Sequence, residues 1–138
     1  RIGHGLGLQY EIPSNQDAGL GESKLVSLFL DDQIALELCP TSNLHIGAVD
    51  SFAEHPISRF LELGLCATIN TDNRLMSNTC LTKELQICTE TFGWDITTVH
   101  TLMRNALSSS FIPTDLKEDL NSVLSDWYLT SSRVHGNT

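Results

Sequence analysis

Three short, mostly apolar stretches along the chain each end in polar residues. They comprise residues 1–3, 34–39 and 65–71, and they run into His4, the turn Thr41–Asn43 and Asp72, respectively. Their length and composition are typical of buried parallel strands. His4, Cys39 and Asp72 are 35 and 33 residues apart, which is about the length of one strand–helix unit. The pattern therefore predicts a parallel α/β structure in which the three polar ends share one rim.

The segments between and after these strands have apolar residues at helical spacing. The expected helices run from a Ser23 cap to about Asp32, from Pro56 to Leu63, from Thr79 to Phe92, from an Asp95 cap to Ser108, and onward from Pro113. Loops are expected at residues 5–21, 40–54 and 73–78, and a frayed tail from Thr130. The order β-α-β-α-β-α-α-α indicates one structural unit.

The last predicted helix has an apolar stripe formed by Leu116, Leu120, Val123, Leu124 and Trp127. A stripe at this spacing is typical of a helix face that packs against a core rather than one that binds a ligand.

Composition places the chain among folded proteins with one domain. It has 138 residues, of which 41% are hydrophobic and 18% charged, and a formal net charge of −9. An acidic chain without a Lys/Arg cluster argues against a nucleic-acid polymer as partner. No apolar segment approaches the ~20 residues that span a bilayer, and no signal peptide opens the sequence, so no membrane association and a cytoplasmic location are expected.

The four cysteines, Cys39, Cys66, Cys80 and Cys88, show neither a Cys-x-x-Cys pair nor zinc-ribbon spacing. We expect buried, reduced thiols. The chain also opens inside a predicted strand, although parallel strands need neighbours on both sides. We therefore expect the C-terminal part of a longer polypeptide.

Candidate chemistry is concentrated at the strand ends: His4, the turn Cys39–Asn43, His45 and the pair Asp72–Asn73. In parallel α/β folds the active site lies at the carboxyl ends of the strands, so a metal site or a general acid–base pair is possible. A structural role is the alternative for each residue, because Asp commonly forms turns or caps helices. One His and one Asp cannot complete the ligand shell of zinc.

The strand-end motifs, taken together, resemble a known enzyme family. The motifs are Arg1-Ile2-Gly3-His4-Gly5, Glu37-Leu38-Cys39-Pro40-Thr41-Ser42-Asn43, and His55-Pro56 leading to Ile69-Asn70-Thr71-Asp72-Asn73. In order and interval they are similar to the last three strand motifs of the adenosine deaminase family. The segments Arg74–Ser77 and Asn105–Ala106, before Ser110-Phe111, resemble bacterial members.

This resemblance implies a (β/α)₈ barrel of the TIM type with one catalytic Zn²⁺. Residues 1–138 would form the C-terminal part of a single deaminase barrel domain, with about three parallel strands and the N-terminal part missing. Asp72 would be a zinc ligand. His4 would be the catalytic histidine that orients a zinc-bound hydroxide as it attacks C6 of the purine. The implied reaction is hydrolytic deamination of adenosine, and of deoxyadenosine, to inosine and ammonia.

Asn73 departs from the commoner family pattern of two successive aspartates. The resemblance implies a hydrogen bond from this position to purine N7, and an Asn amide donates one directly. The family's His-x-His and His-x-Gly-Glu motifs, which supply the other zinc ligands and a proton shuttle, are absent from this sequence. The chain alone is therefore expected to be inactive and to need the N-terminal part of the same barrel as partner. Adenine or another purine as substrate, and a non-catalytic structural or binding module, remain the alternatives.

Overall fold

Three short parallel strands form the centre of the structure. The computed structural model describes residues 1–13 and 23–135. The strands β1 (Ile2–Gly3), β2 (Leu36–Leu38) and β3 (Ala67–Ile69) lie side by side in the order β1-β2-β3. Both pairs are parallel, with Ile2 opposite Leu36 and Leu36 opposite Ala67. The predicted parallel sheet is confirmed, although each strand is shorter than the apolar stretch that contains it.

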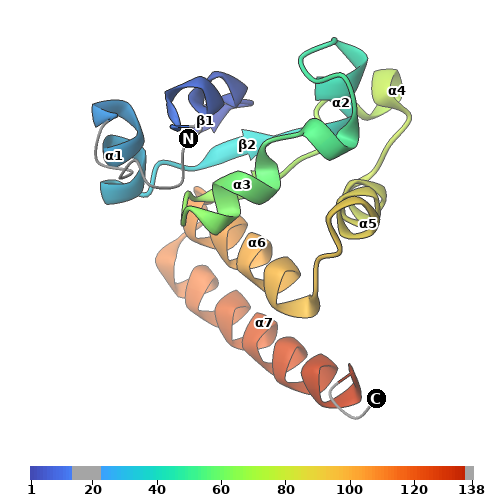
Figure 1. The fold of residues 1–138 in the computed structure, drawn as a ribbon. Helices are drawn as coiled ribbons and strands as arrows, with labels where there is room; N and C mark the ends of the chain where they lie inside the picture. Colours follow the sequence, from blue (N-terminus) through green and yellow to red (C-terminus); the bar gives the residue numbers. More distant parts are fainter. Residues whose placement is uncertain (14–22, 136–138) are drawn as a thin grey trace.

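Five helices lie close to their predicted positions, as Figure 1 shows. They are α1 (Lys24–Asp31), α3 (Ile57–Glu62), α5 (Leu81–Phe92), α6 (Ile96–Ser109) and α7 (Thr114–His135). The predicted caps are present: Ser23 Oγ accepts the Val26 N–H, and Asp95 Oδ1 accepts the Thr98 N–H. Such caps satisfy backbone donors that the first helical turn leaves unpaired.

Four short helices occupy segments that the sequence pattern assigned to loops. They are η1 (Leu6–Glu11), α2 (Pro40–His45), η3 (Phe52–Glu54) and α4 (Arg74–Ser77). The loop prediction was wrong there because one or two helical turns are too short to display apolar periodicity. The part of that prediction that covers residues 14–21 lies outside the described residues.

The core lies between the sheet and the helices that contact it. The side chains that are almost completely removed from solvent include Phe60, Leu36, Leu38, Ile57, Leu65 and Val26. Helices α3, α5 and α6 all contact β3, so β3 is covered while β1 is not. Among the described strands β1 pairs with β2 alone, and its Ile2 is 45% exposed.

The apolar stripe of α7 does not enter this core. Helix α7 lies along α6 (Figure 1), and Tyr128 stacks on His100 of α6 with ring centroids 4.3 Å apart. Leu116, Val123 and Trp127 nevertheless stay 40–65% exposed. The prediction that the stripe is core packing was wrong for this chain. The tail expected to fray from Thr130 is helical to His135.

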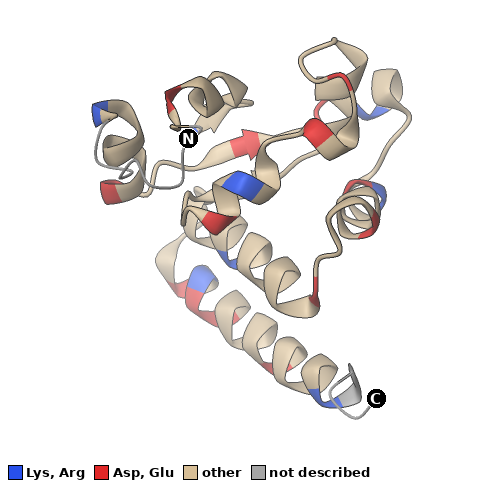
Figure 2. Cartoon of the chain, in the orientation of Figure 1, with Lys and Arg blue, Asp and Glu red and all other residues tan. Residues whose placement is uncertain are grey.

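In the described part of the chain, the charged residues are spread over many elements and the Lys and Arg residues form no cluster. Figure 2 shows Lys and Arg spread over several helices, with Asp and Glu between them; the whole sequence has 8 Lys and Arg against 17 Asp and Glu. Within the residues that the structure describes, no helix combines the length and the apolar character needed to cross a membrane.

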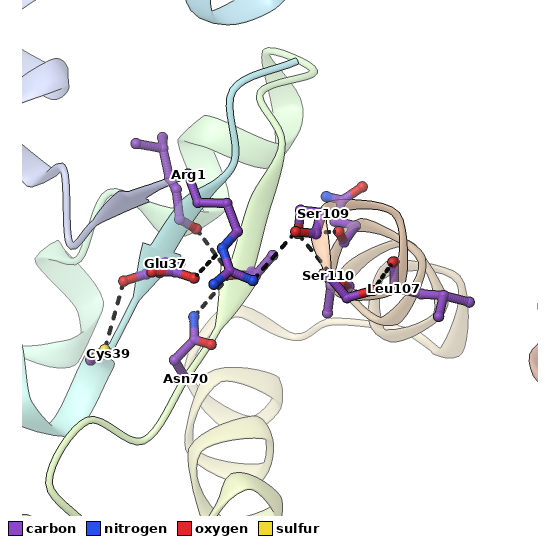
Figure 3. A network of polar contacts seen from close by, with 11 residues as sticks. Arg1, Glu37, Cys39, Asn70, Leu107, Ser109 and Ser110 are labelled. Carbon is purple, nitrogen blue, oxygen red and sulfur yellow. Dashed lines mark hydrogen bonds and ion pairs between the residues drawn. The ribbon is translucent and has the colours of Figure 1, made fainter. Parts of the chain in front are cut away.

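Arg1 connects the sheet to the end of α6. Its Nε lies 2.9 Å from Glu37 Oε1, and its guanidinium donates to the Ser109 carbonyl at 3.3 Å, as Figure 3 shows. The same group lies 3.9 Å from the ring centroid of Phe111. Arg1 and Glu37 are each about one third exposed, so solvent screens the ion pair and its effect is chiefly to fix orientation.

A buried carboxyl group joins α5 to the first turn of α2. Glu84 is fully buried; its Oε2 accepts the Thr41 N–H at 3.0 Å, and its Oε1 accepts the Thr79 hydroxyl at 2.5 Å. The Thr41 N–H belongs to the first turn of α2, where backbone donors have no partner within the helix. Glu84 therefore fixes the start of α2, the helix that follows β2 at the rim.

We expect Glu84→Ala in the full-length protein to lower the free energy of unfolding by roughly 1–3 kcal/mol, because the buried Thr41 N–H loses its acceptor. Thr79 has a second acceptor in the Cys80 carbonyl at 3.4 Å, so it contributes less. Glu84→Gln keeps a carbonyl acceptor and should cost less than Glu84→Ala. Chemical denaturation measures both, with Glu90→Ala on the exposed face of α5 as the control. Equal destabilisation by Glu84→Ala and Glu90→Ala would contradict the role of this contact.

Candidate active site

Residues from all three strand ends meet at one rim of the sheet. His4 follows β1, Ser42 lies in α2 after β2, and Asp72 follows β3. The His4 Nε2 lies 4.0 Å from Asp72 Oδ2, and the Ser42 hydroxyl donates to the same oxygen at 2.7 Å. The predicted convergence of these residues is confirmed. The side chains of His4 and Asp72 are 41% and 44% exposed, so both remain accessible from the rim.

The backbone turns sharply at both of these strand ends. His4 has φ = 57° and Asp72 has φ = 52°, in the left-handed region that few side chains adopt. Gly5, with φ = 67°, continues the turn after His4, and a Cβ built there would lie 2.4 Å from Leu36 Cδ2. Non-glycine residues with such backbone angles cluster at functional sites.

Helix α2 brings a buried amide to the same place. Asn43 is fully buried, its Oδ1 accepts the Cys39 N–H at 3.2 Å, and its Nδ2 lies 3.0 Å from His4 Nδ1. On its other side, His55 Nε2 lies 3.0 Å from Asn43 Oδ1. The sequence placed Asn43 in a turn and His55 in a motif but gave neither a role. The available signal was a histidine directly before Pro56, where a helix begins.

The Cys39 thiol lies beside this group but is not a nucleophile at neutral pH. Burial, with the nearby charges of Asp72 and Glu84, raises the pKa of Cys39 to about 11, so the unreactive thiol form dominates. Cys66 and Cys88 are buried as predicted, whereas Cys80 is exposed, contrary to the prediction. Cys80 is the residue before the first turn of α5, where the chain runs over the surface.

Asn73 and His45 have different surroundings. Asn73 caps α4, since its Oδ1 accepts the N–H groups of Leu75 and Met76 at 3.2 and 3.1 Å. The cap uses the amide oxygen and leaves the Nδ2 hydrogens as donors. His45 is exposed at the C-terminal end of α2, so this candidate is not part of the group around Asp72.

The donors at this rim fit one part of a zinc site. The Ser42 hydroxyl satisfies Asp72 Oδ2, which is the kind of outer contact that orients a carboxylate ligand. A small cavity of about 260 Å³ opens here, lined by Gly3, His4, Glu37, Cys39, Asn70 and Asp72. Within residues 1–13 and 23–135, however, no three His, Cys, Asp or Glu residues are grouped so as to hold a metal ion. Asp72 can therefore offer one carboxylate to a metal ion, but the described residues alone do not form a complete metal site.

Comparison with known proteins gives consistent relatives. A model of the adenosine deaminase family matches residues 1–127. Adenosine deaminase 1 of Streptomyces coelicolor is 44% identical over 115 residues, covering 83% of this chain and 29% of that protein. Adenosine deaminase of Mycobacteroides abscessus is 41% identical over 115 residues, covering 83% and 32%. The chain thus spans about a third of the length of the curated relatives it matches.

Solved structures agree on the fold. The adenine deaminase from Arthrobacter aurescens matches with a TM-score of 0.79 and 25% identity, over 92% of this chain and 36% of that one. An amidohydrolase from Burkholderia ambifaria, with bound Zn, matches with a TM-score of 0.78 and 18% identity, over 100% and 36%. The parallel sheet and its helices are part of a TIM-type barrel. By the family match over most of its length and its curated relatives, the chain belongs to the adenosine deaminase family.

Proposed function

We propose that this chain supplies the C-terminal part of the active site of a zinc-dependent deaminase that converts adenosine, and deoxyadenosine, to inosine and ammonia. The observation that carries the proposal is the meeting of His4, Ser42 and Asp72 at the carboxyl ends of three adjacent parallel strands. In barrels of this type, that rim is where catalytic residues gather. The family match gives the reaction class.

The remainder of the site would come from the N-terminal part of the same barrel domain, so that residues 1–138 form its C-terminal part. Two observations support this arrangement: β1 pairs on one side alone among the described strands, with Ile2 45% exposed, and the chain covers 29–32% of its curated relatives. The added segment would supply the other zinc ligands and the proton shuttle. All four cysteines are free, which suits the reducing cytoplasm as location.

Asp72 would hold the zinc ion through its carboxylate, with Ser42 fixing the orientation of that carboxylate through the 2.7 Å hydrogen bond. When bound, zinc lowers the pKa of water so that hydroxide is available near pH 7. His4 would orient the attacking oxygen and stabilise charge as water adds to C6 and ammonia leaves. The position of His4 is suitable because its ring lies between the buried Asn43 and the exposed rim.

Asn73 would bind the purine. Its Oδ1 is held by the first turn of α4, so the Nδ2 hydrogens remain for an acceptor such as N7, which has a lone pair and no hydrogen. An aspartate at this position would have to be protonated to do the same.

The first test is Asp72→Ala in the full-length enzyme. We expect bound zinc and turnover of adenosine to be lost together, because one carboxylate ligand disappears from a site that needs three or four. Elemental analysis beside the rate of inosine formation measures both. Asp31→Ala, which removes an exposed carboxylate on α1, is the control. Full zinc content and activity in Asp72→Ala would overturn the proposal that this strand end is the metal site.

A second test separates Asn73 from the metal. Asn73→Ala should keep zinc and lower kcat/KM for adenosine by roughly 10- to 100-fold, since one hydrogen bond to a buried acceptor is worth ~1–3 kcal/mol. Loss of the α4 cap costs about 1 kcal/mol of stability, so Asn73→Ser, which can cap but donates from a different position, serves as the matched variant. Loss of zinc from the Asn73→Ala variant would contradict the proposal that Asp72 binds the metal while Asn73 binds the purine.

Substrate choice is tested by comparing rates on adenosine, deoxyadenosine and adenine. The relatives named adenosine deaminase are 39–44% identical to this chain, against 25% for the adenine deaminase structure, which favours the nucleosides. Faster turnover of adenine would show that adenine, not adenosine, is the substrate, while the reaction would still be a deamination. The absence of both zinc and deaminase activity from the full-length wild-type protein would leave the non-catalytic module as the correct reading.

A further inference from the structure

Two side chains that the reaction does not touch form a continuous hydrogen-bonded line to His4. The line runs from His55, just before α3, through Asn43 in α2, to His4 after β1. Each of its two links is 3.0 Å long. His55 is 3% exposed and Asn43 is fully buried, whereas the His4 side chain is 41% exposed. The line therefore leads from the interior of the protein to its accessible rim.

The direction of these hydrogen bonds is fixed at the interior end by the backbone. His55 Nδ1 lies 3.2 Å from the Ile57 nitrogen and accepts its N–H, so this ring nitrogen carries no proton. Burial lowers the pKa of His55 to about 4, and the ring is therefore neutral at pH 7. A neutral imidazole has one proton, which must lie on Nε2. His55 Nε2 accordingly donates to Asn43 Oδ1.

The orientation of the Asn43 amide then fixes the direction of the second hydrogen bond, between Asn43 and His4. Its Oδ1 faces two donors, the His55 Nε2–H at 3.0 Å and the Cys39 N–H at 3.2 Å. An amide nitrogen in that place would present its own hydrogens to both donors, so the oxygen must occupy it. The Nδ2 group on the other side consequently donates to His4 Nδ1. Accepting this bond leaves the proton of a neutral His4 on Nε2.

We infer that Asn43 and His55 are positioning residues that hold His4 in the tautomer protonated at Nε2, the nitrogen that faces Asp72 4.0 Å away. This inference rests on the proposed function of His4. An Nε2–H is a donor toward an oxygen at the rim and toward Asp72. The other tautomer would direct a lone pair at the carboxylate and offer no donor to the attacking oxygen.

A half-exposed histidine in water adopts both neutral tautomers, so the rim alone does not select one. The buried pair fixes the tautomer, because the opposite arrangement would reverse both side-chain hydrogen bonds and leave the backbone N–H groups of Ile57 and Cys39 without an acceptor. Leaving buried donors without an acceptor is costly, and this cost opposes the reversal. The orientation of a catalytic imidazole by a second residue, and that residue by a third, is a recurring arrangement in enzymes.

The test is Asn43→Asp in the full-length, zinc-loaded enzyme. The carboxylate still accepts from His55 and Cys39, but it cannot donate to His4, so His4 Nδ1 must become the donor. ¹⁵N NMR of histidine-labelled protein at pH 8 reports the tautomer directly, with the His4 signals assigned by their loss in His4→Gln. We expect Nε2 to be protonated in the wild type and Nδ1 in Asn43→Asp. We also expect kcat to fall roughly 100-fold or more, as for a catalytic histidine in the wrong tautomer, with KM changed little.

Asn121→Asp is the matched control, because it adds the same charge on the exposed surface of α7 and should change neither the spectrum nor kcat. If Asn43→Asp does not fold, two variants of His55, His55→Leu and His55→Gln, provide the test instead. His55→Leu removes the donor and should lower kcat by roughly 10-fold, the usual cost of losing an outer contact. His55→Gln, whose amide can donate, should retain most of the rate.

The outcomes separate this inference from the proposed function. A wild-type His4 protonated at Nδ1, or an Asn43→Asp enzyme with unchanged tautomer and kcat, would overturn the inference while leaving the deaminase activity intact. A full-length wild-type protein without zinc and without deaminase activity would instead overturn the proposed function, and the NMR spectrum would still decide the tautomer.

Discussion

Parallel pairing of β1, β2 and β3 is the constraint on which the site depends. Parallel strands place all their carboxyl ends at one edge, so residues far apart in sequence arrive at the same rim. The hydrogen bonds from Ile2 N–H to Ala35 O and from Leu36 N–H to Cys66 O fix the register. A slip of one residue would reverse every side chain between the two faces of the sheet. His4 and Asp72 would then no longer face each other.

Helix α2 converts this shared edge into a defined polar site. Two buried groups fix the position of α2. Glu84 of α5 accepts the Thr41 N–H, and Asn43 of α2 itself accepts the Cys39 N–H and bonds to His4. Neither Glu84 nor Asn43 itself has a direct part in the proposed reaction. Buried polar groups of this kind are costly unless satisfied, so these hydrogen bonds favour one arrangement of α2, and with it the position of Ser42 against Asp72.

One end of the sheet is buried by helices, whereas the other end is exposed. β3 is buried and contacts α3, α5 and α6, while β1 and the apolar face of α7 remain exposed. Fully burying side chains such as Leu or Phe stabilises a fold by about 1.5–3 kcal/mol each, and Ile2 and Val123 obtain only part of that within this chain. In the proposed barrel, the N-terminal part would supply both the core contacts that this uncovered edge lacks and the other ligands of the proposed metal site.

Local sequence determined the features that depend on neighbouring residues. The apolar runs around Leu36 and Ala67 indicated buried strands, and Ser23 and Asp95 indicated helix starts, because propensity and capping act over a few residues. The spacing of His4, Cys39 and Asp72 indicated a shared rim, since one strand–helix unit has a nearly fixed length. The motifs at these strand ends indicated the family, which the comparisons confirmed.

Tertiary structure alone decided which polar residues act together. Nothing local distinguishes Asn43 from His45, two residues apart in α2, yet one is fully buried and bonded to His4 while the other is exposed. The same holds for α7. Its apolar stripe has the period of a core helix, but α7 packs along α6 and most of the stripe stays exposed. Burial depends on what the rest of the fold places opposite a side chain, and that is not encoded in the spacing of residues within one helix.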